Sequence, residues 1–180
     1  MSTYYRGFIA AGFGGQGILS LGQIVAYAAM KEGRFVTWIP SYGPEMRGGT
    51  ANCSVIASEE EIASPVVSSP DVLVIMNQPS LEKFEAILKP GGVLLYNSDL
   101  VRYEKPRQDV TVLAVPANST AAELGNDKVA NVIVLGVLSA HTDLVGEEAC
   151  RQTIADLFGK KKASLVELNL KAFDKGRTLL

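Results

Sequence analysis

The chain has 180 residues, of which 47% are hydrophobic and 20% are charged, and its formal net charge is −2. This length and composition predict one globular domain over residues 1–180. A small negative charge provides no basic surface, so we expect no nucleic-acid partner and no binding to an anionic membrane. The first residues lack the pattern of a signal peptide and no apolar run is long enough to span a bilayer, so we expect a cytoplasmic protein.

The first motif is a glycine-rich stretch between a predicted strand and a predicted helix. The strand, 5–11, leads into Gly12-Phe13-Gly14-Gly15-Gln16-Gly17, and apolar residues at helical spacing continue to about residue 31. Because glycine has no Cβ, the N–H groups at such a helix start can face an anion or a partner's polar group. The spacing is also that of dinucleotide-binding loops. The acid that would bind the ribose does not follow the second strand, however, so classical NAD binding is disfavoured.

A second glycine-rich segment follows the next predicted strand, 35–39, which Pro40 closes. It consists of Ser41, Tyr42, Gly43, Pro44, Glu45, Met46, Arg47, Gly48 and Gly49. Open α/β sheets bind ligands at the carboxyl ends of their strands, where this segment begins. We therefore expect it to hold Glu45 and Arg47 against a ligand or a partner subunit. The simpler alternative is a surface connection whose exposed ion pair contributes little.

The rest of the chain alternates between predicted strands and helices. Residues 50–57 alternate in polarity, which predicts a half-buried strand that forms a hairpin through the acidic turn at 58–61. Continuous apolar runs predict buried strands over 71–76, 93–97 and 110–115. Helices are predicted over 81–88, 118–124, 128–140, 147–158 and 162–175. Gly176 is predicted to end the last of these, as Gly33 is predicted to end the helix after the glycine stretch. The sequence thus predicts an α/β fold: a Rossmann-like, mostly parallel sheet with helices on both faces and an antiparallel hairpin.

Three further polar positions are candidates for function. Asn77 and Gln78 follow a buried strand, and parallel packing would bring them near the glycine stretch, but capping of the next helix explains them equally well. The helix 128–140 is apolar nearly all round, which predicts burial on every side. Asn131 is its polar member, so we expect it to tie that helix to a loop or to face a ligand. His141, the only histidine, ends the same helix. We interpret it as a cap, because no Ser or Cys motif offers it a nucleophile.

In order along nearly the whole chain, these motifs resemble the gamma subunits of the 2-oxoacid:ferredoxin (acceptor) oxidoreductases. The segment Tyr42-Gly43-Pro44-Glu45-x-Arg47-Gly48-Gly49 is specific to that family. Further matches are Ser64-Pro65, Asp71, Asn77-Gln78-Pro79, Gly91-Gly92, Pro116-Ala117, Leu124-Gly125, Asn131 and Leu135-Gly136. The resemblance implies a role in the oxidative decarboxylation of a 2-oxoacid on thiamine diphosphate, with coenzyme A taking the acyl group and ferredoxin the electrons. Among the family's substrates, it favours 2-oxoglutarate.

A partial role fits the rest of the sequence. There is no Gly-Asp-Gly thiamine motif for magnesium diphosphate, and Cys53 and Cys150 cannot supply the four thiolates of an iron–sulfur cluster. We therefore expect thiamine diphosphate, Mg²⁺ and the clusters on partner subunits, no metal or cofactor and no catalytic residue on this chain, and no activity of the chain alone. In that family role, the glycine stretch and residues 41–49 would face the thiamine-bearing subunits and help frame the coenzyme A route. A stand-alone nucleotide-binding regulator is the alternative, and a homodimer of the isolated chain is left open.

Overall fold

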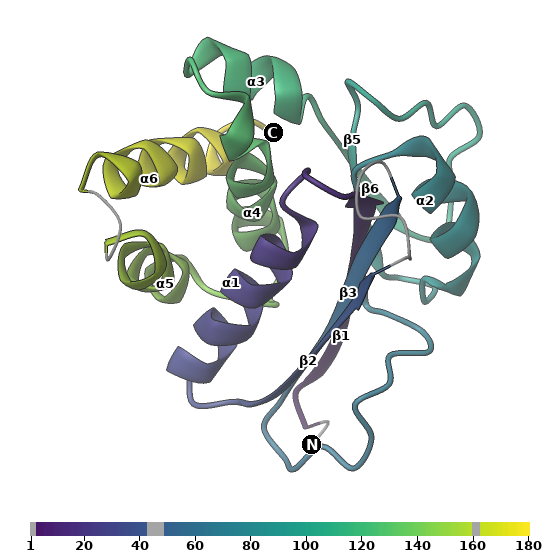
Figure 1. Cartoon of the computed structure of the whole chain (residues 1–180). Helices are drawn as coiled ribbons and strands as arrows, with labels where there is room; N and C mark the ends of the chain where they lie inside the picture. Colours follow the sequence, from purple (N-terminus) through teal and green to yellow (C-terminus); the bar gives the residue numbers. More distant parts are fainter. Residues whose placement is uncertain (1–2, 43–48, 160–162) are drawn as a thin grey trace.

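Six strands form one sheet with helices on both faces in the computed structural model, which describes residues 3–42, 49–159 and 163–180 (Figure 1). The strands are β1 (Tyr5–Phe13), β2 (Phe35–Tyr42), β3 (Thr50–Ser58), β4 (Val72–Ile75), β5 (Val93–Asn97) and β6 (Thr111–Val115). The helices are α1 (Ile18–Lys31), α2 (Gln78–Phe84), α3 (Ala117–Glu123), α4 (Ala130–His141), α5 (Glu147–Gly159) and α6 (Ala163–Arg177), with short 3₁₀ helices η1 (Glu85–Ile87) and η2 (Asp127–Val129).

The strand order is β2-β3-β1-β4-β5-β6. Neighbours from β1 through β4 and β5 to β6 are parallel, whereas β3 is antiparallel to both β1 and β2. The predicted sheet class is confirmed, but the place of the hairpin is wrong. β3 pairs with the strand before it, and the acidic residues 59–61 begin an irregular connection to β4. Because β3 has a partner on each side, no edge is left for a strand after the acidic turn.

The two faces of the sheet carry different helices. Figure 1 shows α1, α4, α5 and α6 on one side and α2 on the other. On β1, Phe8 and Ala10 pack in the larger core cluster with α1 and α4, while Ile9 and Ala11 pack in a smaller one with Leu81 of α2. This division follows from the period of two along a strand, since alternate side chains point to opposite faces.

Two elements continue past the residues predicted to end them. β2 runs through Pro40, which an edge strand tolerates because one of its sides needs no N–H donors. α6 runs through Gly176, because this glycine serves a helix crossing and not a cap. A Cβ on Gly176 would overlap the Ile133 carbonyl, and one on Gly136 would overlap the Phe173 carbonyl. The two glycines thus let α4 and α6 approach closely.

α4 is the central helix of the larger cluster. Its residues from Ala130 through Leu138 are all buried, which confirms the burial predicted from its apolar sequence. None of the helices that the structure describes is long and apolar enough to cross a membrane.

Candidate functional site

The glycine stretch forms the turn from β1 into α1 at the carboxyl end of the sheet. Gly15 and Gly17 have φ values of 95° and 74°, which only glycine adopts readily. Gly17 is the N-cap of α1 and provides no side-chain hydrogen bond, and the first turn of α1 contains no acidic residue. No side chain at the N-cap accepts a hydrogen bond from the first N–H groups of α1. This end of the helix is therefore suited to an anion.

Gln16 fastens this turn to the neighbouring strand. Its Oε1 accepts a hydrogen bond from Phe13 N–H at 2.7 Å, and its Nε2 donates to Met76 O at 3.0 Å. A Cβ on Gly12 would lie 2.6 Å from Gln16 Oε1, so the bridge needs glycine at that position. Gln16 thus holds the ends of β1 and β4 together.

Asn131 connects α4 to the same turn. Its side chain is 6% exposed, and its Nδ2 donates to Gly17 O at 3.1 Å. A Cβ on Gly17 would overlap the Asn131 side chain. The prediction that Asn131 ties its helix to a loop is confirmed, and the loop is the glycine turn.

A cavity of about 240 Å³ lies between this turn and the start of α4. It is lined by Gly15, Gln16, Met76, Asn118, Asp127, Lys128, Ala130 and Asn131. In the strand order, β2 and β3 lie on one side of β1, and β4, β5 and β6 lie on the other. The direction of the strand order thus changes at β1, and open α/β sheets bind ligands at such a point. The sequence did not indicate Asn118 or Lys128, because they reach the glycine turn only through the fold.

The polar residues after β4 act first as caps. Asn77 Oδ1 accepts from Ser80 N–H at 3.0 Å at the start of α2. Gln78 Oε1 accepts from Arg102 N–H at 2.9 Å, and Gln78 lines a separate hollow on the α2 side. Capping therefore accounts for Asn77 and a loop contact for Gln78, and neither residue lines the cavity beside the glycine turn. The Nδ2 of Asn77 is buried without a hydrogen-bond partner among the described residues.

The predicted segment 41–49 meets the glycine turn at its far end. Gly14 N–H donates to Gly49 O at 3.0 Å, and Ser41 pairs with Asn52 where β2 and β3 run together. Tyr42 is the last residue of β2. The other predicted members of the segment lie outside the described residues, and their roles stay predictions: Gly43, Pro44, Glu45, Arg47 and Gly48.

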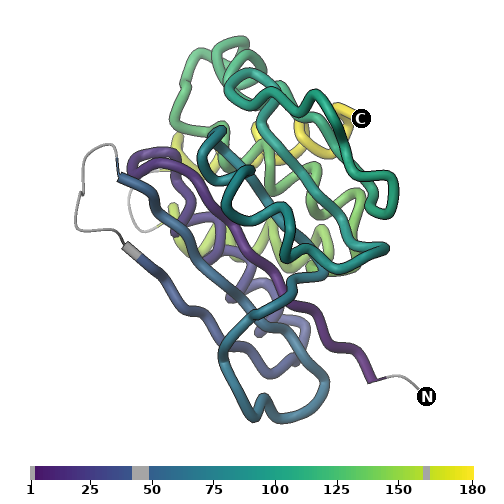
Figure 2. The backbone as a smooth tube through the Cα atoms, turned by 90° about the vertical axis from the view of Figure 1, so that its right-hand side faces the viewer, coloured from purple at the N-terminus to yellow at the C-terminus, as the bar shows by residue number. Residues whose placement is uncertain are grey.

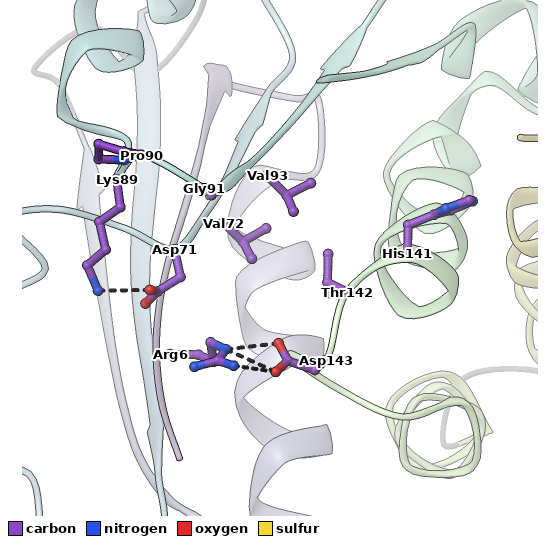
Figure 3. A pocket seen from close by; sticks show the side chains of 11 residues that line it. Arg6, Asp71, Val72, Lys89, Pro90, Gly91, Val93, His141, Thr142 and Asp143 are labelled. Atoms are coloured by element: carbon purple, nitrogen blue, oxygen red, sulfur yellow. Dashed lines mark hydrogen bonds and ion pairs between the residues drawn. The ribbon is translucent and has the colours of Figure 1, made fainter. Parts of the chain in front are cut away.

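A second hollow, of about 370 Å³, lies at the opposite end of the sheet (Figure 3). Arg6 Nε donates to Asp143 Oδ1 at 2.9 Å, and Lys89 Nζ lies 2.8 Å from Asp71 Oδ1. The hydrogen bond from Arg6 holds the pKa of Asp143 below its usual value. Figure 3 shows the His141 ring turned away from both ion pairs. Since these four charged residues are paired within the chain, we interpret the ion pairs around this hollow as structural.

The two cysteines are unreactive core residues. Cys53 and Cys150 are both buried, and burial raises the pKa of Cys53 to about 11 and that of Cys150 to about 12. Thiols with such pKa values are protonated at neutral pH and are therefore poor nucleophiles. Within the described ranges, no three His, Cys, Asp or Glu side chains gather into a metal-binding group. The described residues therefore provide no ligand set for an iron–sulfur cluster or a magnesium diphosphate.

A family model described as pyruvate ferredoxin/flavodoxin oxidoreductase matches residues 7–179 of the chain. The chain belongs to this family. The resemblance drawn from the sequence motifs is thereby confirmed, as is the fold, because a solved member of the oxoacid:ferredoxin oxidoreductases has the same architecture. That structure, "2-oxoglutarate:ferredoxin oxidoreductase from Magnetococcus marinus with 2-oxoglutarate, coenzyme A and succinyl-CoA bound", superposes with a TM-score of 0.89 at 29% identity. The match covers 99% of this chain and 31% of that one.

Family members carry this unit in two forms. The ketoisovalerate oxidoreductase subunit VorA of Methanothermobacter marburgensis is 44% identical over 92% of this chain, which spans only 34% of VorA. The 2-oxoglutarate synthase subunit KorC of Methanocaldococcus jannaschii is 39% identical over 92% of this chain and 89% of KorC. The same unit is thus about a third of some longer chains and nearly the whole of others.

Proposed function

We propose that the chain is a non-autonomous gamma subunit of a 2-oxoacid:ferredoxin oxidoreductase. The observation that carries the proposal is its similarity to KorC over nearly the full length of both chains, together with the same similarity to one third of VorA. A unit that is fused in one relative and separate in another acts within a larger assembly. In this role, thiamine diphosphate, Mg²⁺ and iron–sulfur clusters are held by partner subunits, and electrons leave to ferredoxin.

The site's part in this reaction is to bind a polar or anionic portion of coenzyme A. The uncapped start of α1 and the exposed Lys128 both contribute positive potential at the cavity beside the glycine turn, and Asp127 of the same lining contributes one carboxylate against them. Gln16 and Asn131 hold the turn in place, and the segment 41–49 adjoins it through Gly49. Arg47 would add a cation and Glu45 would orient it. The chain's residues bind and orient, and bond making takes place on the partner subunits.

We favour 2-oxoglutarate as the substrate, as the motifs and the KorC relative suggest. The higher identity to VorA makes a branched-chain 2-oxoacid the competing choice. In an assembled complex, kcat/KM should be highest for 2-oxoglutarate among 2-oxoglutarate, pyruvate and 3-methyl-2-oxobutanoate. A higher kcat/KM for 3-methyl-2-oxobutanoate would show that the substrate assignment is wrong and leave the subunit assignment intact.

Reconstitution tests the subunit assignment itself. The chain is co-expressed with the thiamine-binding and iron–sulfur subunits of the same organism. Reduction of ferredoxin or of a viologen dye is followed with thiamine diphosphate, Mg²⁺, coenzyme A and a 2-oxoacid. We expect full activity with this chain, less than a tenth of it without the chain, and none from the chain alone. Turnover by the isolated chain would refute the proposal.

A stand-alone nucleotide-binding regulator is the second candidate, favoured by the Gly12-x-Gly14-x-x-Gly17 spacing alone. Titration calorimetry of the isolated chain with NADH, FAD and ATP distinguishes the two. Dissociation constants in the micromolar range would support the regulator, whereas the subunit assignment predicts no heat of binding.

A further inference from the structure

One face of the β2–β3 hairpin carries no helix. The strand register places Phe35, Thr37, Ile39 and Ser41 of β2 opposite Ser58, Ile56, Ser54 and Asn52 of β3. We call these eight residues the hairpin face. Ile56 and Ser58, at one end of it, are already buried within the chain, and the other six are partly or largely exposed. All eight point to the α2 side of the sheet, because Ser54 also pairs with Ile9, which packs in the α2 cluster. In Figure 2, α2 lies in front of the β4–β5 part of the sheet, while no helix among the described residues lies in front of β2 and β3.

Large apolar side chains are exposed on and beside this face. Phe35 is 48% exposed and Ile39 is 39% exposed, although both lie in a regular strand. At the two ends of the adjoining β1, Tyr5 and Phe13 are 43% and 37% exposed. An antiparallel strand pair with one face in water usually carries polar and charged side chains on that face. Covering these four side chains would remove apolar surface from water and so stabilise an assembly.

The hairpin face also lacks charge. None of its eight residues is Asp, Glu, Lys or Arg, although these make up 20% of the chain. Nor does β2 contain any charged residue over Phe35–Tyr42, and charges, especially lysine, are the usual protection of a free edge strand. An uncharged surface with exposed aromatic and aliphatic side chains is typical of the core of a protein interface.

We propose that the hairpin face is the docking surface for the partner subunit that corresponds to the remainder of VorA beyond this unit. The proposal rests on the assignment as a gamma subunit and specifies where that subunit is held. About two thirds of VorA and of the Magnetococcus marinus chain lie outside the region that this chain matches. Where the unit is a separate chain, as in KorC, no linker raises the local concentration of the partner, so the contacting surfaces alone must supply the affinity.

The same features define the chemistry of the partner. Its contacting surface must be apolar and uncharged at the centre, because a charge placed against Phe35 and Ile39 would be desolvated without a counter-ion. The hydroxyl and amide groups of Ser41, Ser54 and Asn52 would pair with polar groups at its margin. A second copy of this chain is a poorer occupant, since Pro40 removes one N–H from β2 and so weakens pairing of two β2 edges.

The test uses the reconstituted complex and matched lysine substitutions. Ile39→Lys charges the hairpin face, whereas Met30→Lys places the same charge on α1, where Met30 is 56% exposed. The dissociation constant between this chain and its partner subunits is measured by interferometry, with circular dichroism melts of each isolated variant. We expect Ile39→Lys to weaken assembly at least tenfold and Met30→Lys less than twofold, with both variants folded. Phe35→Glu provides a second variant of the face and should behave as Ile39→Lys does.

Three results would overturn the inference. If Ile39→Lys and Phe35→Glu both assemble as the wild type does, the docking surface lies elsewhere and the subunit assignment is unaffected. If Ile39→Lys dissociates a homodimer of the isolated chain but leaves the complex intact, the face joins two copies of this chain. If the wild-type chain does not bind the neighbouring subunits at all, the proposed function itself fails, which an assembly assay on the wild type reveals before any variant is made.

Discussion

The two ends of the parallel strands use their polar groups in opposite ways. At the amino ends, Arg6, Asp71, Lys89 and Asp143 form two ion pairs and so satisfy one another. At the carboxyl ends, the side chains of Gln16 and Asn131 hold a glycine turn in place, and the start of α1 is left without a side-chain cap. The first arrangement stabilises the fold and the second prepares a surface for a ligand. Polar residues around a hollow are therefore weak evidence for a ligand site until their internal partners are counted.

The largest effect is expected at the glycine turn. Gly17→Ala should lower the free energy of unfolding by about 2–4 kcal/mol, because the new Cβ is strained at a positive φ and also overlaps the Asn131 side chain. Gly33→Ala is the matched control, since Gly33 has a φ of 77° with no atom within 4 Å of an added Cβ; it should cost about 1 kcal/mol. Urea denaturation measures both, and equal losses would show that Asn131 does not pack against the turn.

Removing the tie between α4 and the turn should have a smaller effect. Asn131→Ala deletes the hydrogen bond to Gly17 O and should reduce the free energy of unfolding by about 1–2 kcal/mol. Thermal and urea unfolding of the isolated chain measure the loss. A variant as stable as the wild type would mean that this hydrogen bond does not hold the turn.

A pair of lysine substitutions compares the two ends in the assembled enzyme. Lys128→Gln removes the exposed cation at the carboxyl-end cavity and should raise the KM for coenzyme A about fivefold, which corresponds to about 1 kcal/mol. Lys89→Gln removes a cation from the amino-end hollow and should leave that KM unchanged. If the KM rose with Lys89→Gln but not with Lys128→Gln, the anion site would lie at the amino end of the strands, which would contradict our account.

The smallest effect concerns the amino-end ion pair. Arg6 lowers the pKa of Asp143 in the folded chain, so the pair stabilises the fold above the unfolded pKa and its contribution is lost as the pH falls through the folded pKa. Because the Asp143 side chain is 60% exposed, Asp143→Asn should cost only about 0.5 kcal/mol at pH 7. The difference from the wild type should shrink as the pH falls through the folded pKa, which lies below the ordinary aspartate value. Urea unfolding at pH 7 and pH 3 provides the check, and a difference that grows in acid would contradict the sign.

Local patterns in the sequence predicted much of the fold. The strand predicted over 93–97 has the same bounds as β5, and Gly33 follows α1 with a positive φ. Both could be predicted because periodicity and capping depend on residues that are close in the sequence. The insertion of β3 between β1 and β2 was missed, since sheet order depends on contacts between distant segments. Gly176 was mistaken for a helix end because its role depends on Gly136 in another helix.

The candidate site divides in the same way. The glycine turn and Asn131 could be recognised from sequence, since glycine spacing and a polar residue in an apolar helix are both local signals. Asn118 and Lys128 could not be recognised. Asn118 lies in α3 and Lys128 in η2, and only the packing of the fold brings them to the turn. For Asn77 and Gln78 the sequence left a site and capping equally open. Their hydrogen bonds are used for capping and for a loop, and a role at the site stays a prediction.

Hydrogen–deuterium exchange on the isolated chain and on the reconstituted complex tests the central contrast most directly. Slower exchange of backbone amides in residues 12–17 on assembly and on addition of coenzyme A, with no change in residues 89–93, is the result that our account predicts. Protection of residues 89–93 with an unaffected glycine turn would contradict it, because the amino end of the sheet would then be the working surface.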